Sequence, residues 1–333
     1  MADTSVRTVA ADGTVARHAV DDLAALLADP GAGWLWLDVP EPDASTATLL
    51  VDVLGVHPAA AADGLARNHV ARLHHYADVL YLALHRPCPG ERGHVHYLEL
   101  DLYVAPRFLV TLHGPRNPSV SLDELLRETV DVAARLDAGR LRPAGPTALA
   151  YSLVSALTNA QERIVNEFAQ QVGLLEQRVM AQADDDRPQD FLDELFTVRH
   201  TLLTVRTMAS QGSEVLGRAA ALSTRAGGAD AALLEDLHDQ YHRLARITHS
   251  QLEFLGGVTD FYRARTDTRM LIAAERLAVI AAVTLPVAAV SGIFGMNLIV
   301  NDATRWWELA IVVAAMLGTS LWLLRWARRQ GWW

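Results

Sequence analysis

Lysine is absent from this chain, and cysteine is nearly so. All 29 basic residues are arginine, and Cys88 is the only cysteine among 333 residues. A single cysteine excludes an intrachain disulfide framework and is typical of a reducing compartment. The first residues also lack a charged segment followed by an apolar run, so we expect no cleaved secretory signal.

Positive charge is scarce outside the C-terminal end. Residues 298–333 hold four arginines and two acidic residues, so residues 1–297 carry a net charge of −12 against −10 for the whole chain. An acidic body of this kind argues against nucleic acid as a partner and favours cations. We find no Ser/His/Asp or Cys/His arrangement and no glycine-rich phosphate loop in a context that supports catalysis, so the sequence does not predict an enzyme.

Two apolar runs near the C-terminus are long enough to cross a bilayer. They extend from Leu277 to Phe294 and from about Trp306 to Trp326, and a spanning helix needs roughly 20 residues. Arginines cluster before the first run and after the second, whereas the connection holds only Arg305. By the positive-inside rule, we expect a multi-pass protein of a bacterial-type inner membrane with both termini in the cytoplasm.

The residues before these runs predict an α+β membrane protein with an N-terminal cytoplasmic α/β domain. Strands are predicted at Gly33–Val39, Val79–Leu84, Leu98–Val104 and Arg107–Leu112. In Leu98–Val104 apolar and polar side chains alternate, which predicts a sheet buried on one face only.

The helical remainder is predicted to form a stalk and a membrane part. We expect an α/β domain over 1–142, antiparallel long helices over 143–228, a stalk helix over 229–270, a first transmembrane helix over 271–297, an outer loop over 298–305, a second transmembrane helix over 306–326 and a basic tail over 327–333.

Two spans per chain cannot enclose a polar path, so conduction would require several copies around an axis. In the first span, Leu277, Leu285 and Gly292 are eight and seven residues apart, which places them on one helical face. Such a face could line a pore. Alternatively, Leu277 and Leu285 are ordinary lipid-facing residues.

Phe294-Gly295-Met296-Asn297 forms a short polar turn between the two spans. With Gly292 and Ile293 it reads GIFGMN, and it resembles the signature of the CorA family of divalent metal ion transporters. Upstream, Trp36-Leu37-Asp38 and the segment Leu54–Pro58 followed by Asp63 resemble the opening of the family sequence. The α/β domain, the long helices and the stalk also follow one another in the same order as in the family, so the resemblance covers the whole chain.

The resemblance implies a homopentamer in membrane lipid whose first spans line one central pore. Gly295, Met296 and Asn297 would form the selectivity filter at the outer mouth, where carbonyl oxygens hold Mg²⁺ through its waters. Leu277 and Leu285 match the hydrophobic gate of the family. Leu271 departs from it, because relatives often carry asparagine there. Alternatively, the Gly-Met-Asn motif only caps the helix.

The resemblance also implies regulation by cytoplasmic Mg²⁺. Asp260 and Asp236 match stalk carboxylates of the family, and Glu91 is the acid nearest to the partner position. A bound cation would neutralise facing carboxylates of neighbouring subunits and favour the closed state. Alternatively, these acids are solvated surface residues.

Histidine pairs are the candidate transition-metal ligands. His238 and His242 have the i, i+4 spacing that can bind Zn²⁺ or Co²⁺, and His94 and His96 point to one side of a strand. Solvated surface histidines are the alternative.

The leading hypothesis is a Mg²⁺ channel gated by cytoplasmic Mg²⁺. The alternatives are a Zn²⁺ transporter of the ZntB-like branch and a non-conducting, membrane-anchored sensor.

Overall fold

The strands of the N-terminal part form one mixed sheet. The computed structural model describes residues 4–181, 188–225, 230–298 and 306–329, and its sheet has the order β2-β1-β3-β7-β6-β5-β4. Neighbouring strands are antiparallel, except that β3 and β7 run parallel. The strands are β1 (Ser5–Val9), β2 (Val15–His18), β3 (Trp34–Val39), β4 (Arg72–Tyr76), β5 (Val79–Pro89), β6 (Val95–Val104) and β7 (Phe108–Leu112).

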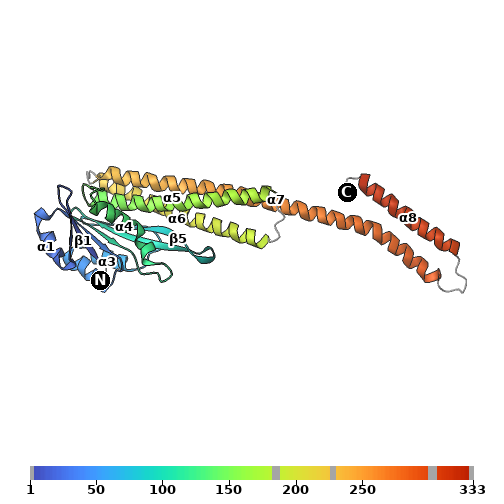
Figure 1. Cartoon of the computed structure of the whole chain (residues 1–333), viewed down its shortest axis with the longest axis horizontal. Coiled ribbons are helices and arrows are strands. Elements are labelled where there is room, and N and C mark those ends of the chain that lie inside the picture. Colours follow the sequence, from blue (N-terminus) through green and yellow to red (C-terminus); the bar gives the residue numbers. More distant parts are fainter. Residues whose placement is uncertain (1–3, 182–187, 226–229, 299–305, 330–333) are drawn as a thin grey trace. The chain divides into compact units, whose positions relative to one another are not determined.

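Short helices precede the long ones in the chain (Figure 1). The α-helices are α1 (Leu23–Ala28), α2 (Ala44–Thr48), α3 (Pro58–Leu65), α4 (Leu122–Asp137), α5 (Pro146–Met180), α6 (Pro188–Arg225), α7 (Ala231–Leu298) and α8 (Trp306–Arg329). Single turns of other helix types are η1 (Val20–Asp22), η2 (Pro30–Ala32), η3 (Leu49–Val53) and η4 (Glu91–Gly93). The chain divides into two compact units, Met1–Gly256 and Gly257–Trp333.

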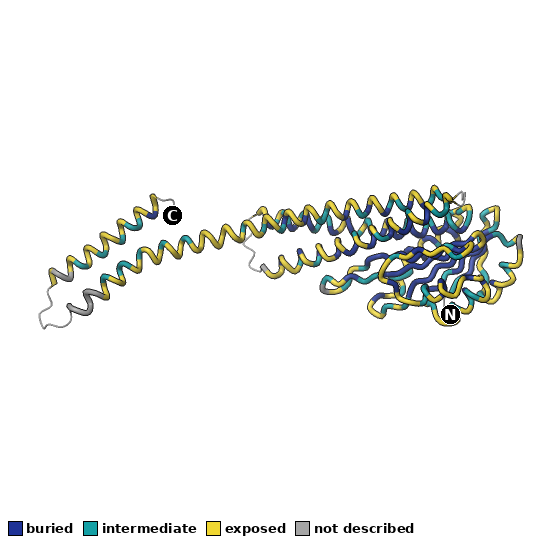
Figure 2. The backbone as a smooth tube through the Cα atoms, turned by 180° about the vertical axis from the view of Figure 1, so that it is seen from behind, coloured by how far each residue is buried: buried dark blue, intermediate teal, exposed yellow. Residues whose placement is uncertain are grey.

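Both faces of the sheet are covered. Leu35, Leu37, Tyr81 and Tyr103 belong to a core that also contains Leu23, Leu50 and Ala60 from α1, η3 and α3. The opposite face packs against the long helices, because α5 contacts β3, β5, β6 and β7 while α6 contacts β4 and β5. Figure 2 shows the buried residues gathered in this sheet and in the helix faces against it.

The prediction that Leu98–Val104 is buried on one face only was wrong. All residues of this part of β6 are buried, including Glu99 at 6% and Asp101 at 0% exposure. The reason is that α3 and the residues after it cover the second face: the Tyr103 hydroxyl donates to the Ala60 carbonyl at 2.8 Å, and Asn68 hydrogen-bonds the Glu99 carboxylate. The polar residues of the alternating pattern therefore form a buried polar network.

Candidate membrane pore and metal-sensing residues

Two of the described helices are long and apolar enough to cross a membrane. These stretches lie within Ala231–Gly292, at the C-terminal part of α7, and in Ala310–Arg329 of α8. Almost none of either apolar window is buried within the chain. Apolar helices without a protein cover need lipid or further protein around them.

Within the C-terminal unit, α7 and α8 pack along one face of each helix. The partly covered residues of α7 recur at three- and four-residue intervals: Glu275, Val279, Val283, Pro286, Val287 and Val290. Those of α8 do the same, and the buried Ala327 continues the pattern: Val312, Met316, Ser320, Leu323 and Leu324. The Ser291 hydroxyl lies 3.9 Å from the Met316 sulfur, which joins the two helices.

The face with Leu277, Leu285 and Gly292 lies away from α8. Successive helix residues are about 100° apart, so these three residues fall opposite the partly covered set of α7. Leu277 is 67% and Leu285 66% exposed, and Leu271 on the adjoining edge is 71% exposed. A second helix of the same chain therefore does not close off the face that the sequence assigned to a pore.

One threonine hydroxyl in each span has an acceptor within its own helix. The Thr284 hydroxyl donates to the Ile280 carbonyl at 2.9 Å, and the Thr319 hydroxyl donates to the Ala315 carbonyl at 2.9 Å. Internal acceptors of this kind allow hydroxyls to lie in a bilayer without an unpaired donor. These threonines do not require a polar partner outside their helix.

The Gly-Met-Asn motif lies at the end of α7. The helix continues to Leu298, so the backbone of Gly295, Met296 and Asn297 is helical. These residues do not form the turn described from the sequence, whereas the first transmembrane helix predicted over 271–297 includes them. The side chains of these residues and the connection 299–305 lie outside the described part of the chain.

Asp236 is held by neighbouring polar groups on the N-terminal unit. Its Oδ2 atom accepts hydrogen bonds from the Tyr151 hydroxyl and from Gln240 Nε2, both at 2.7 Å. The bond to Asp236, together with burial, raises the pKa of Tyr151. Metal binding by Asp236 would have to replace or share these two donors.

Asp260 and Glu91 lie in different units of the chain. Asp260 is an exposed residue of α7 in the C-terminal unit, and Glu91 is an exposed residue of η4 in the N-terminal unit. Their pairing between subunits stays a prediction.

His238 is engaged with α6. Its Nδ1 atom lies 2.7 Å from the Ser213 carbonyl oxygen and 3.2 Å from the Ser213 hydroxyl. The rings of His238 and His242 have centroids 6.1 Å apart. Across the described residues, no three His, Cys, Asp or Glu side chains are arranged as a set of metal ligands. Metal binding by His238 and His242 therefore stays a prediction, and His238 already contacts Ser213 of α6.

Sequence reasoning missed the buried carboxyl pair Glu99 and Asp101. Asp101 Oδ1 accepts a hydrogen bond from the Tyr81 hydroxyl at 2.9 Å, and Oδ2 has no hydrogen-bond partner among the described residues. Burial, and then the nearby charge of Glu99, raise the pKa of Asp101 well above its usual range. Burial likewise raises the pKa of Glu99. The alternating pattern places Glu99 and Asp101 on the same face of the strand. Nothing in the sequence indicated that this face of the sheet is covered, so the burial of the two acids was not predicted.

Asp101→Asn is expected to make the stability of the protein less dependent on pH. The folded pKa of Asp101 lies above its unfolded value near 4, so its contribution to stability is present below about pH 4 and is lost as pH rises through the folded pKa. The loss has a limiting slope of about 1.4 kcal/mol per pH unit. Asparagine cannot ionise, so melting temperatures of the purified protein should fall less between pH 5 and 8. Asp52→Asn, at an exposed position, is the control, and equal pH slopes in Asp101→Asn and the unmodified protein would contradict the expectation.

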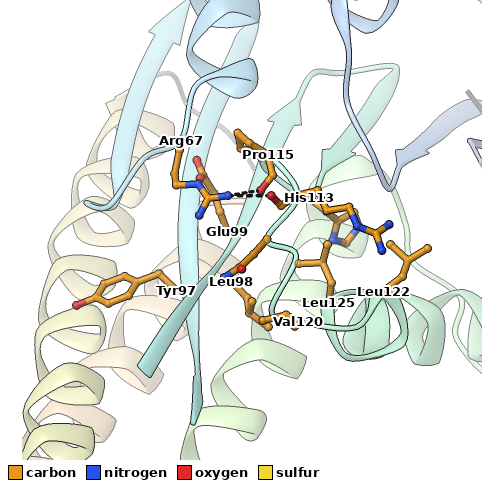
Figure 3. A pocket seen from close by; sticks show the side chains of 11 residues that line it. Arg67, Tyr97, Leu98, Glu99, His113, Pro115, Val120, Leu122 and Leu125 are labelled. Carbon is orange, nitrogen blue, oxygen red and sulfur yellow. Dashed lines mark hydrogen bonds between the residues drawn. The ribbon is translucent and has the colours of Figure 1, made fainter. Parts of the chain in front are cut away.

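A small cavity lies beside Glu99 (Figure 3). Arg67 extends across it, and its Nη2 atom donates to the carbonyl oxygens of Pro115 and Arg116 at 2.8 and 3.1 Å. The cavity has a volume of about 20 Å³, which is room for about one water. It is too small for a hydrated metal ion and does not form a candidate transport or sensing site.

Comparison with known proteins identifies relatives over nearly the whole chain. The family model for the CorA-like Mg²⁺ transporter protein matches residues 31–329. YfjQ of Bacillus subtilis (strain 168), a proposed metal ion transporter, is 22% identical over 91% of this chain and 91% of its own. The cobalt/magnesium transport protein CorA of Thermotoga maritima is 19% identical over 84% of this chain and 78% of its own.

Solved structures agree in fold. The complete structure of the CorA magnesium transporter from Methanocaldococcus jannaschii is similar with a TM-score of 0.78 at 16% identity, over 99% of this chain and 98% of that one. At this identity the likeness establishes the fold: a mixed α/β N-terminal part, long helices and two C-terminal apolar helices.

Proposed function

The chain belongs to the family of CorA-like Mg²⁺ transporter proteins, and from this membership we propose that five copies form a Mg²⁺ channel in the cell membrane. Divalent metal ion transport is the activity of the family, which is not a family of enzymes. To this family activity, the proposal adds that the ion is Mg²⁺, that five copies assemble, and that cytoplasmic Mg²⁺ gates the channel.

The exposed face of α7 carries this proposal. Leu277, Leu285 and Gly292 lie opposite the face that packs on α8. If five copies place this face toward a common axis, α7 lines the pore and α8 lies between α7 and the lipid. Close contact between neighbouring α7 helices is favoured by small residues in the same span, which allow backbones to approach: Ala281, Ala282, Ala288 and Ala289.

Selection of Mg²⁺ is proposed to occur at Gly295, Met296 and Asn297. Mg²⁺ loses its water slowly and prefers oxygen ligands. A ring of Asn297 side-chain carbonyls with Gly295 backbone carbonyls would bind the hydrated ion by hydrogen bonds to its waters. Neutral oxygens suit transient binding, because an ion held by a ring of carboxylates leaves more slowly.

Gating is proposed to depend on carboxylates at subunit interfaces. The body of the chain is strongly acidic, since residues 1–297 carry a net charge of −12. Like charges brought together by assembly repel, and a bound divalent cation removes this repulsion. Mg²⁺ at Asp260 and Glu91, and at Asp236 in the first turns of α7, would then favour the closed state. Both termini would lie in the cytoplasm.

Asp260→Ala is expected to weaken the protection that Mg²⁺ gives the stalk against protease. Loss of one carboxylate per subunit removes a ligand from each proposed site, so the Mg²⁺ concentration for half-maximal protection should rise by about tenfold, equivalent to ~1.4 kcal/mol of binding free energy. The measurement is limited proteolysis of the purified protein over a Mg²⁺ series. Asp267→Ala, two turns further along α7 at another exposed position, is the control. Protection at the same Mg²⁺ concentration in all three proteins would remove Asp260 from the proposed site.

Flux into liposomes tests the proposed function as a whole. The purified protein should admit Mg²⁺ under an inside-negative potential, and its mass in detergent should equal five chains of 36.3 kDa. Zn²⁺ flux without Mg²⁺ flux would support the zinc-transporting branch instead. A monomer that conducts neither ion would support a membrane-anchored sensor.

A further inference from the structure

The tip of the β5–β6 hairpin brings together sulfur and nitrogen ligands that the proposed Mg²⁺ path does not use. In the strand register, Cys88 of β5 lies directly opposite His96 of β6. Directly opposite residues of antiparallel strands have Cβ atoms about 5 Å apart on the same face. The ring of His94 joins them, because its centroid lies 4.6 Å from that of His96.

These three side chains line an open groove of about 670 Å³. Glu91 of η4 and Glu124 of α4 also line it, so carboxylates border the sulfur and nitrogen atoms. The groove is wide enough for a metal ion that keeps one or more waters. Access from solvent is direct, because Glu91 and His94 are exposed.

The backbone of the hairpin tip is closed by its own hydrogen bonds. The Gly90 amide donates to the His94 carbonyl at 2.7 Å, and the His94 amide donates to the Glu91 carbonyl at 3.0 Å. A Cβ atom on Gly90 would lie 2.7 Å from His96 Nε2. Glycine at this position therefore makes room for the His96 ring in a turn that is closed by its own hydrogen bonds.

The chemistry of this set differs from that expected at a Mg²⁺ site. Mg²⁺ prefers oxygen ligands, whereas thiolate and imidazole favour Zn²⁺ and Co²⁺. Burial and the neighbouring His94 lower the pKa of His96, which favours the neutral ring, the form that binds a metal. Burial raises the pKa of the Cys88 thiol, so a metal must displace its proton.

We propose that Cys88, His94 and His96 bind a borderline divalent ion such as Zn²⁺ or Co²⁺, with a carboxylate of Glu91 or Glu124 or a water completing the site. Without the ion, no three such side chains of the described residues are gathered as ligands, so Cys88 and His94 rotate toward His96 on binding. The site differs from the Gly-Met-Asn motif, and its existence does not depend on which ion the pore conducts.

Titration of the purified full-length protein with Co²⁺ tests the proposal. Thiolate bound to Co²⁺ gives a sulfur-to-metal charge-transfer absorption, and Cys88 is the only cysteine of the chain. The band can therefore arise at this site alone. We expect it to saturate at one Co²⁺ per chain, to vanish in Cys88→Ser, and to require at least about tenfold more Co²⁺ in His96→Ala, the change given by ~1.4 kcal/mol of lost binding free energy. Excess Zn²⁺ should remove it.

The control variant is His249→Ala, which removes an exposed histidine from α7. Its Co²⁺ titration should match that of the unmodified protein, and melting temperatures should show that each variant is folded. Co²⁺ binding without the sulfur band, or a band that equimolar Mg²⁺ removes, would overturn the proposal. Neither result bears on Mg²⁺ flux into liposomes, so this proposal and the proposed transport function can fail separately.

Discussion

Asn297→Ala is expected to lower Mg²⁺ flux by roughly 10- to 100-fold. Hydrogen bonds to a charged group contribute about 1.5–3 kcal/mol, and a change of this size in the entry barrier corresponds to such a factor in rate. Each copy of the assembly loses one side-chain carbonyl at the proposed outer mouth. The measurement is the initial rate of Mg²⁺ entry into liposomes of equal protein content, read with a Mg²⁺-sensitive dye.

The matched control for this variant is Asn301→Ala, which makes the same substitution four residues further along the chain. It should conduct within about twofold of the unmodified protein, because it lies outside the proposed filter. The mass in detergent should be the same for all three proteins, so that loss of assembly is not mistaken for loss of selectivity. If Asn297→Ala conducts Mg²⁺ at the rate of the unmodified protein, the proposal that Asn297 forms a selectivity ring is wrong.

Leu285→Asn is expected to let Mg²⁺ pass when the pore should be closed. Leu285 is exposed on the α7 face opposite α8, and a ring of leucines around an axis closes a pore by excluding water. Asparagine side chains would hold water in the constriction. Flux at a saturating internal Mg²⁺ concentration should rise by at least about tenfold, which corresponds to a barrier lower by ~1.4 kcal/mol.

Ile280→Asn separates a pore effect from a general effect of a polar residue in the span. Ile280 is 58% exposed, but it lies about 140° around the helix from Leu285 and so falls outside the proposed gate. This variant should not raise closed-state flux, although it could lower the amount of protein inserted. Equal leakage through both variants would indicate damage to the membrane part and would contradict a gate at Leu285.

The long helices and the spans were predictable because their patterns are local. The sequence predicted antiparallel long helices over 143–228, and the structure has α5 at Pro146–Met180 and α6 at Pro188–Arg225. Periodic apolar residues and the proline and glycine breaks are sufficient for such boundaries. The four predicted strands were also confirmed as β3, β5, β6 and β7, although β5 and β6 are longer than expected. Strands β1, β2 and β4 were not predicted, because each is short and largely lacks a continuous apolar run.

The sequence by itself determined the family, the two candidate spans and the residues of the proposed filter, since these depend on a motif and on apolar length. Only the tertiary structure decided which residues are neighbours across the chain. Strand register places Cys88 opposite His96, and α3 buries Asp101 on the face that alternation alone would leave in water. Helix packing turns Leu285 away from α8. Register, layer packing and helix rotation arise from contacts between distant segments, and a one-dimensional pattern does not contain those contacts.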